Sequence, residues 1–421
     1  MKEFMLRPLI INRCYLFDQS PGGECLRTFV KSLNKNQYTP VIYASDRSPL
    51  VSGEGEDVKL IKEYRFVRYL AAVVRRILIP DLTFLPGYEW YSWGIGTRRK
   101  ILKDIQQGVE FDYIHSVSFP CASHKVALDV KKKTGLPWVM QLYDPWADNP
   151  YRPFKTCFFK NIDWKQEREC VENADLIIHD NQKIADLWSQ RYGSDIAKKI
   201  VVLPLTIPLP NVQVIEKKHR CNEKLIISHI GNLMLNRTSQ PFILAVSNLL
   251  NKHPEYRKKL IVNYVGAVTQ LDIELISSNG LNDIFNLIGS VSAEECVKYY
   301  EQSDIFLAID GVNKDNLFFP SKILKYLFFR RPILGITPNG SVLDFELRQS
   351  GHVSIENTDL QSIEKYLEKA IIDYDSLLSF NYSYWQKFQP SNIVEQYTSM
   401  INRYLNIDKN ETSNNRRFLC K

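Results

Sequence analysis

Residues 304–310 read DIFLAID, residues 321–331 read SKILKYLFFRR, and residues 332–338 read PILGITP. The first and third stretches are short apolar runs rich in β-branched residues, which is typical of buried strands, whereas the second carries apolar residues at helical spacing. A strand, a helix and a second strand of these lengths predict a βαβ unit with parallel strands. These residues therefore favour an α/β fold.

The same alternation runs along two long stretches of the chain. In the C-terminal half it extends from LIISHIGN at residues 225–232 to the helical LQSIEKYLEKAIIDY at residues 360–374. In the N-terminal half it extends from LIINRCYL at residues 9–16 to KIVVLPL at residues 199–205. Two such stretches predict two Rossmann-like domains, each a doubly wound parallel sheet. Because such sheets bind ligands outside the carboxyl ends of their strands, we expect the two domains to face each other across a cleft.

The domain boundaries are predicted where the alternation stops. Residues 204–224 are rich in proline and then in charge, which is typical of a connection between domains. The helical pattern NIVEQYTSMINRYL at residues 392–405 is expected to pack across the junction. The predicted organisation is an N-terminal domain (1–203), a linker (204–224), a C-terminal domain (225–380), a crossover helix region that returns to the N-terminal domain (381–405) and a mobile tail (406–421).

The composition of the chain excludes several classes of protein. Its 421 residues, 44% hydrophobic and 24% charged, suit a globular protein of two domains. The sequence contains no run of eighteen apolar residues, so we expect no transmembrane helix. The N-terminus lacks a signal-peptide cleavage site, so we expect a cytoplasmic protein. The eight cysteines form no C-x-x-C pair, which argues against a disulfide framework or a structural zinc site.

Positive charge is concentrated in one segment. Between residues 59 and 103 there are ten Lys and Arg residues against three acidic ones, together with Tyr88, Trp90, Tyr91 and Trp93. Basic and aromatic residues together suit nucleic acid or an anionic membrane surface. Because no nucleic-acid-binding motif accompanies them, we expect no nucleic acid partner and favour a peripheral position on the inner face of the plasma membrane. The alternative is a solvated helical face whose aromatic residues pack inward.

A helix start in the C-terminal half carries an unusual charge. Pro320 and Ser321 are start signals, and Lys322 follows in the first turn. A cation is disfavoured there because the helix dipole is positive at that end. An anion bound at the helix start would remove the conflict, since free N–H groups and the ammonium would both contact it. Gly231 and Arg237 suit the same role, because glycine permits close approach of a ligand and arginine binds phosphate.

Several motifs in order resemble the donor domain of family 4 retaining glycosyltransferases. In the C-terminal half these are G-N-L-x₃-R from Gly231, I-G-S-V-S-x-E-E from Ile288, S-D-I-F-L from Ser303 and F-P-S-K-x₃-Y-L-x₃-R-P-I-L from Phe319. The N-terminal half contains S-P-G-G at residues 20–23 and P-W-V-M-Q-L-Y-D-P-W at residues 137–146, which are similar to that family as well. The resemblance covers roughly residues 8–400 and implies the GT-B fold, with an acceptor-binding N-terminal domain and a nucleotide-sugar-binding C-terminal domain.

The resemblance implies roles for individual residues and no bound metal or cofactor. Arg237 and Lys322 correspond to the pair that contacts the donor diphosphate, and Gly22 and Gly23 correspond to a loop against the donor phosphates and the acceptor. The backbone at Ser290 and Val291 corresponds to the loop that recognises the nucleobase. We therefore expect catalytic residues at Arg237, Lys322 and Asp144, and donor-binding residues at Gly22, Gly23, Gly231, Asn232, Ser290, Val291, Ser321 and Lys325.

Three positions depart from the family pattern. Leu317 and Lys325 stand where the family usually has two glutamates, and Tyr143 stands where it usually has a histidine. Lys325 lies three residues after Lys322, so both side chains are predicted to point toward the bound anion. Asp144 is predicted to orient the acceptor hydroxyl, with a loop-capping role as the equal alternative.

The predicted activity is transfer of a hexose-type sugar, with retention, from a nucleotide diphosphate sugar to a lipid-linked or polysaccharide acceptor, in surface polysaccharide biosynthesis. Arg237, Lys322 and the helix start would stabilise the charge that develops on the departing diphosphate. No carboxylate pair suits a double displacement, so front-face attack is expected. The alternatives are a weakly active or non-catalytic nucleotide-sugar-binding subunit and a nucleotide-sugar epimerase of the same fold.

Overall fold

The computed structural model describes residues 5–18, 20–47, 55–67, 69–70, 73, 89–118, 121–147, 149, 157–210, 212, 223–233, 237–311 and 317–405. The chain forms two compact units, and each is built around its own parallel sheet. The first unit comprises Met1–Pro208 and Lys387–Lys421, and the second comprises Leu209–Gln386. Two doubly wound α/β sheets are therefore present, as the alternation of strands and helices predicts. The predicted tail at residues 406–421 lies outside the described residues.

The first unit contains a seven-stranded parallel sheet in the order β3-β2-β1-β4-β5-β6-β7. Every residue of β1, β2, β4, β5 and β6 is buried, because helices cover both faces of the sheet. The strands are β1 (Pro8–Ile11), β2 (Val41–Ser45), β3 (Asp57–Ile61), β4 (Tyr113–Val117), β5 (Trp138–Leu142), β6 (Leu176–His179) and β7 (Ile200–Val202).

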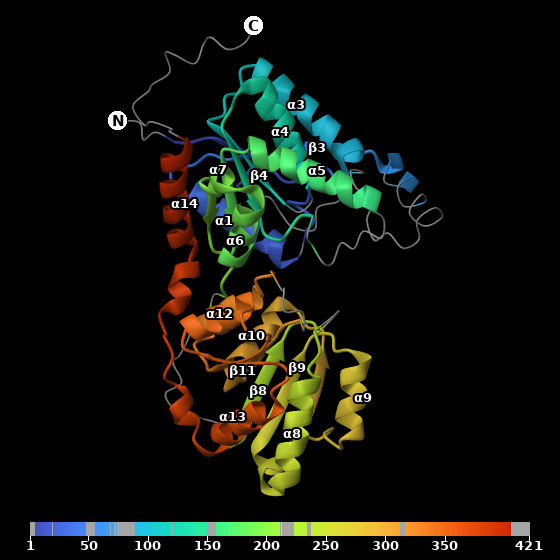
Figure 1. Ribbon diagram of the computed structural model, residues 1–421, viewed down its shortest axis with the longest axis vertical. Coiled ribbons are helices and arrows are strands. Elements are labelled where there is room, and N and C mark those ends of the chain that lie inside the picture. Colours follow the sequence, from blue (N-terminus) through green and yellow to red (C-terminus); the bar gives the residue numbers. More distant parts are fainter. Residues whose placement is uncertain are drawn as a thin grey trace. The chain divides into compact units, whose positions relative to one another are not determined.

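Helices connect these parallel strands. They are α1 (Pro21–Asn34), a π-helical turn (Trp90–Gly94), α3 (Ile95–Gln106), α4 (Ala122–Thr134), α5 (Cys157–Asn173), α6 (Gln182–Tyr192) and α7 (Ser194–Ala197). The C-terminal helix α14 (Pro390–Leu405) also belongs to this unit and packs beside α1 (Figure 1). The predicted return of the last helix to the N-terminal domain is thus confirmed.

A buried polar network attaches α14 to the sheet of the first unit. The Tyr397 hydroxyl lies 3.0 Å from the Tyr113 hydroxyl and 3.0 Å from Nδ1 of His115. Nε2 of His115 lies 2.9 Å from Oε1 of Gln141 on the neighbouring strand. Burial lowers the pKa of His115 to about 4, so its ring is neutral at physiological pH. The network thus connects α14 to β4 and β5 without burying a charge.

The second unit contains a six-stranded parallel sheet in the order β10-β9-β8-β11-β12-β13. Its strands are β8 (Leu225–Ile230), β9 (Leu260–Val265), β10 (Phe285–Gly289), β11 (Ile305–Ile309), β12 (Ile333–Ile336) and β13 (Val353–Ile355). Its helices are α8 (Gln240–Lys252), α9 (Gln270–Ser278), α10 (Ala293–Gln302), α11 (Lys322–Phe329), α12 (Val342–Gln349) and α13 (Leu360–Ile372). Because β8 is central, the residues that follow it lie at the middle of the sheet's carboxyl edge.

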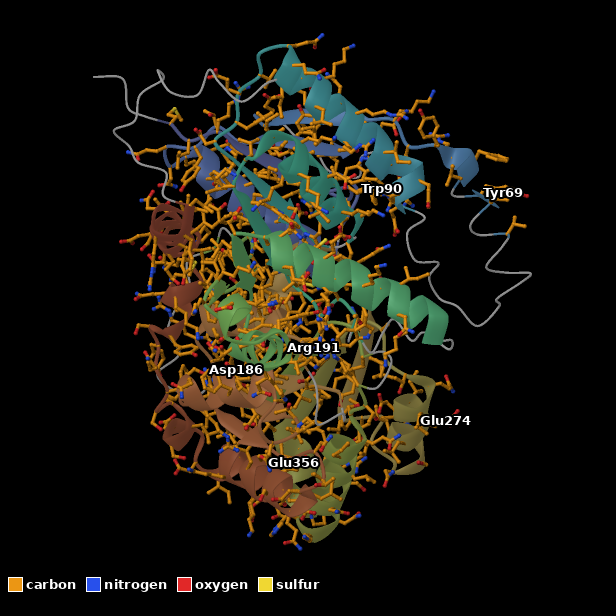
Figure 2. The ribbon with its side chains drawn as sticks, turned by 45° about the horizontal axis from the view of Figure 1, so that its top comes forward. Tyr69, Trp90, Asp186, Arg191, Glu274 and Glu356 are labelled. Atoms are coloured by element: carbon orange, nitrogen blue, oxygen red, sulfur yellow. The ribbon has the colours of Figure 1, made fainter. Side chains whose placement is uncertain are left out.

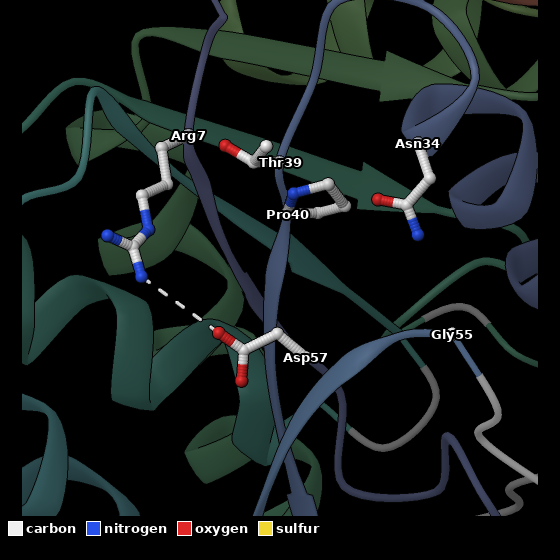
Figure 3. A pocket seen from close by; sticks show the side chains of 6 residues that line it. All are labelled: Arg7, Asn34, Thr39, Pro40, Gly55 and Asp57. Carbon is white, nitrogen blue, oxygen red and sulfur yellow. Dashed lines mark ion pairs between the residues drawn. The ribbon is translucent and has the colours of Figure 1, made fainter.

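A pocket of about 410 Å³ opens at the opposite, amino edge of the first sheet. Figure 3 shows Arg7 and Asp57 facing each other there, with an Arg7 nitrogen 3.9 Å from an Asp57 oxygen. Both side chains are more than 40% exposed, at 43% and 44%. Ligands of parallel α/β sheets bind at the carboxyl edge, so this pocket lies on the wrong edge for the predicted site.

No helix within the described ranges is long and apolar enough to cross a membrane.

Candidate active site

The ends of three neighbouring strands form the floor of the candidate site in the second unit. The Gly231 amide, just after β8, donates to the Val265 carbonyl at 2.7 Å, and the Gly266 amide donates to the Gly289 carbonyl at 2.8 Å. Gly231 and Gly266 have φ of +135° and +126°, which side-chain-bearing residues rarely adopt. A Cβ at Gly266 would stand only 2.7 Å from the Gly231 carbonyl oxygen, so the close backbone approach here requires glycine.

Lys322, the first residue of α11, places its ammonium above this floor. Its Nζ lies 3.1 Å from Nε2 of His229, the penultimate residue of β8. The same Nζ is only 3.3 Å from the point where a Cβ would stand on Gly231. Gly231 therefore provides the space that the Lys322 ammonium occupies.

Two further charges stand beside this ammonium. Nε of Arg237 lies 4.0 Å from Oδ1 of Asp310, which follows β11 and is buried. Burial and the positive charge of Arg237 lower the pKa of Lys322 to about 7, against the opposing effect of Asp310. Two cations and one carboxylate leave the site a net positive charge when Lys322 is protonated, which suits an anionic ligand.

The helix start differs from the prediction in one respect. Ser321 precedes α11 with helical backbone angles and makes no capping hydrogen bond through its side chain. The Ile323 amide donates to the Pro320 carbonyl at 3.0 Å, and the Leu324 amide donates to the Ser321 carbonyl at 3.1 Å. Two amides at the helix start, which were predicted to be free for an anion, therefore donate hydrogen bonds within this turn. Side chains, rather than helix amides, therefore supply most of the positive potential here.

The other predicted donor residues of this unit lie in the neighbouring loops. Oδ1 of Asn232 accepts from the Ala267 amide at 2.9 Å, which joins the loop after β8 to the loop after β9. Ser290 and Val291 follow β10 directly and precede α10. Lys325 lies beside Cys296 of α10 and acts to lower the pKa of that thiol, which burial raises. The charges that shift the pKa of Lys322 are Arg237 and Asp310, and Lys325 is not among them.

The first unit places Gly22 and Gly23 in the first turn of α1, rather than in the loop that S-P-G-G suggests. Ser20 caps the helix, its hydroxyl accepting from the Gly23 amide at 3.4 Å, and Pro21 begins it. A Cβ on Gly23 would overlap the Asp18 carbonyl oxygen, whereas a Cβ on Gly22 would meet only ordinary contacts at 3.7 Å, one of them with Tyr143. The segment before α1 therefore lies against this helix turn.

Asp144 stands near the same turn, after β5. Its removal from solvent, and the nearby Asp18 carboxylate, raise the pKa of Asp144 to about 6. The hydrogen bonds found within the described residues include none to the Asp144 carboxylate, so they give no support to a loop-capping role. A carboxyl group with a raised pKa beside a second carboxylate is a common feature of functional sites.

Two site residues were missed in the sequence. His229 and Asp310 each follow or end an apolar strand, where a single polar residue carries no local signal of function. His229 contacts Lys322, and Asp310 affects the pKa of Lys322. Both are close to Lys322 only because β8 and β11 are neighbours in the sheet.

Comparison with known proteins gives the family. Residues 23–209 match the model of Glycosyltransferase Family 4. No curated protein matches the chain. Sucrose-phosphate synthase from Thermosynechococcus elongatus has a similar structure, with a TM-score of 0.66, 12% identity, and coverage of 96% of this chain and 100% of that one.

Two further solved structures are similar over nearly the whole chain. HepE from Anabaena, solved in complex with UDP-glucose, has a TM-score of 0.61 at 12% identity, and the match covers 94% of this chain and 100% of that one. The lipopolysaccharide outer core galactosyltransferase WaaB has a TM-score of 0.60 at 10% identity, covering 95% and 99%. At these identities the likenesses show the fold, which is GT-B. The match over residues 23–209 places the first unit in glycosyltransferase family 4, a family of retaining enzymes that use nucleotide sugars.

Proposed function

We propose that the protein transfers a hexose from a nucleotide diphosphate sugar to a lipid-linked or polysaccharide acceptor, and that Arg237 and Lys322 bind the donor diphosphate. The observation that carries the proposal is the half-buried Lys322 ammonium above Gly231, with Arg237 close enough to lower its pKa. Two neighbouring cations repel each other, and a bound diphosphate would remove this unfavourable electrostatic energy.

The chemistry follows from where charge develops. Breaking the bond between the anomeric carbon and the phosphate oxygen leaves negative charge on the nucleotide diphosphate, and Lys322 and Arg237 stand where they would stabilise it. The acceptor oxygen attacks the same face of the sugar, its proton passes to the departing phosphate oxygen, and the configuration is retained. Gly231, Gly266 and Gly289 allow the donor to approach the backbone closely, and Asn232, Ser290, Val291 and Ser321 complete the proposed donor site.

We propose that the first unit binds the acceptor near Asp144. A carboxyl group with a pKa of about 6 is ionised at neutral pH and accepts a hydrogen bond from a hydroxyl group. Asp144 would thereby orient the acceptor hydroxyl, and the turn at Gly22 and Gly23 would border the sugar and phosphates. The uridine nucleotide in the HepE structure makes UDP-hexoses the first donors to test.

The proposal is tested by transfer of radiolabelled hexose from UDP-glucose, UDP-galactose and UDP-N-acetylglucosamine to a membrane extract. Incorporation into lipid-extractable or polymeric product, with the α-configuration of the donor kept in the product, is the expected result. Conversion of a donor into its epimeric nucleotide sugar, with no transfer to an acceptor, would indicate a nucleotide-sugar epimerase instead. Binding of the nucleotide with no consumption of any donor would indicate a binding subunit.

An exposed surface on the first unit fits a membrane-bound acceptor. Its apolar residues are Tyr64, Phe66, Tyr69, Leu70 and Tyr91, exposed by 49% to 73%, and we call them the aromatic patch. The Tyr64 amide donates to the Ser92 carbonyl at 2.9 Å, so the two segments that carry the patch are neighbours. Figure 2 shows Tyr69 projecting away from the ribbon, whereas Trp90 lies closer to α3.

Some residues of the basic segment pack inward or form ion pairs, and others are exposed. Trp90 and Trp93 are buried, and Arg98 pairs with Asp129 at 3.1 Å, as the alternative of an inward-packed helical face would require. Lys62 and Arg65 are exposed next to Tyr64 in the sequence, and Arg99 on α3 is exposed as well. Arg75 and Arg76 lie outside the described residues. We propose that the exposed cations and the aromatic patch bind an anionic membrane.

Reversal of Lys62, Arg65 and Arg99 to glutamate is expected to release the protein from vesicles that contain anionic lipid. Each charge removed weakens binding by about 1 kcal/mol near such a surface. Sedimentation with vesicles of 30% phosphatidylglycerol in phosphatidylcholine, roughly at physiological salt, measures the effect. A matched reversal of Lys35, Lys198 and Arg403, which are exposed on other elements of the same unit, controls for net charge. Equal release by both triple variants would argue against a specific membrane surface.

A further inference from the structure

His229 occupies a position that the proposed mechanism does not yet use. It is 1% exposed, on the central strand β8, and its two ring nitrogens have different partners. Nδ1 lies 2.9 Å from the Leu307 carbonyl oxygen on β11, and Nε2 lies 3.1 Å from Nζ of Lys322. Both neighbours are fixed in chemical role, because a carbonyl oxygen only accepts a hydrogen bond and an ammonium only donates one.

These partners determine the tautomer of the ring. Nδ1 must carry the proton that is donated to Leu307, so in the neutral ring Nε2 has a free lone pair that accepts from Lys322. A charged ring would place an N–H group against the ammonium. Burial and the adjacent cations Lys322 and Arg237 lower the pKa of His229 well below its ordinary value, against the opposing effect of hydrogen bonding to the backbone of Leu307 and Gly231, which agrees with a neutral ring.

The long side chain of Lys322 needs such an anchor. Lysine has several rotatable bonds, and an ammonium bound at its tip loses much of that freedom. With one N–H donated to His229, the ammonium stays above Gly231 with two N–H groups left for a ligand. We propose that His229 is a positioning residue, which holds the Lys322 ammonium in its donor-binding place through a neutral ring fixed by the Leu307 carbonyl. This inference rests on the proposed role of Lys322.

The charged and titratable groups around Lys322 define the expected pH behaviour. They are Arg237 from the segment before α8, Asp310 from the loop after β11 and the ring of His229 from β8. A hydrogen-bond acceptor stabilises the protonated lysine, so its loss should lower the Lys322 pKa below about 7. A purely structural role for His229 would leave that pKa unchanged as long as the fold is kept.

Two substitutions test the roles of the two ring nitrogens separately. In His229→Asn the amide nitrogen stands at the place of Nδ1, so the bond to Leu307 is kept and the acceptor for Lys322 is lost. In His229→Gln the amide oxygen reaches the place of Nε2, so the acceptor for Lys322 is kept. The Lys322 pKa is measured from the ¹³Cε shift in lysine-labelled protein, with the signal assigned by its absence in Lys322→Arg. Thermal unfolding of each variant reports whether the fold is kept.

We expect the Asn variant to titrate about one pH unit lower than the wild type and the Gln variant to stay close to the wild type. At pH 7.5 the Kd for UDP, measured by calorimetry, should rise about tenfold in the Asn variant and less in the Gln variant. Equal Lys322 titration in all three proteins would overturn the inference. Unchanged UDP binding in Lys322→Ala would instead overturn the proposed diphosphate site, so the two failures are distinguishable.

Discussion

Replacement of Lys322 or Arg237 by alanine is expected to lower kcat about 10²–10³-fold while the fold is kept. Both side chains act on the charge of the leaving diphosphate, which is larger in the transition state than in the bound donor. The side chains of Lys322 and Arg237 interact with polar groups, at 3.1 Å from His229 and 4.0 Å from Asp310 respectively. We therefore expect their removal to leave the hydrophobic core intact. Initial rates at saturating donor, beside thermal unfolding of each variant, provide the measurement.

A lysine on a neighbouring helix offers a matched control for these variants. Lys298 on α10 is exposed, so its replacement by alanine removes one positive charge from the same unit without touching the candidate site. The control should keep the wild-type rate. Wild-type rates in both Lys322→Ala and Arg237→Ala would mean that the phosphates bind elsewhere.

Gly23→Ala is expected to produce the second large effect, on both stability and turnover. Its new Cβ would overlap the Asp18 carbonyl oxygen and stand 2.9 Å from Cβ of Asp18, so the helix turn and the preceding segment must separate. Overpacking of this kind costs about 1–3 kcal/mol. Because Asp18 is close enough to raise the pKa of Asp144, the shift would also displace the proposed acceptor site and lower turnover about 10–100-fold.

Gly22→Ala is the matched control for stability. The two glycines are adjacent in the first turn of α1, but a Cβ on Gly22 meets its nearest atoms at 3.7 Å, an ordinary contact. Its free energy of unfolding should stay within about 1 kcal/mol of the wild type. If denaturant unfolding gave both variants the same stability, the close contact between Gly23 and Asp18 would not be what requires glycine there.

Most of the regular parts of the fold were predictable from the sequence, and the edge strand β3 was not. Strands such as β8 and β11 are continuous apolar runs between helices, so both their type and their parallel arrangement follow from the pattern. The edge strand β3 was missed because its Asp57 and Lys59 are charged and only one residue, Ile61, is buried. The sequence S-P-G-G suggested a turn, whereas Ser20 and Pro21 begin α1 one turn earlier than the apolar pattern does.

The candidate site was predictable only in part, for a topological reason. The sequence suggested Arg237 and Lys322 because each follows a strand or begins a helix, and the carboxyl ends of neighbouring strands lie together. The hydrogen bond between His229 and Lys322 joins residues 93 positions apart, and no local pattern encodes it. The effect of Lys325 on the pKa of the Cys296 thiol depends on how α11 packs beside α10, which helical spacing alone does not give.

The attachment of α14 to the first unit has a consequence for how the protein is made. Tyr397 bonds to Tyr113 across 284 positions, so the second unit, Leu209–Gln386, is inserted within the first. During synthesis from the N-terminus, residues up to Pro208 leave the ribosome long before α14 exists to complete their core. The second unit is continuous in sequence and has its own hydrophobic core. All of its residues are therefore synthesised before α14, which completes the first unit. The domain synthesised first is therefore the one that finishes folding last.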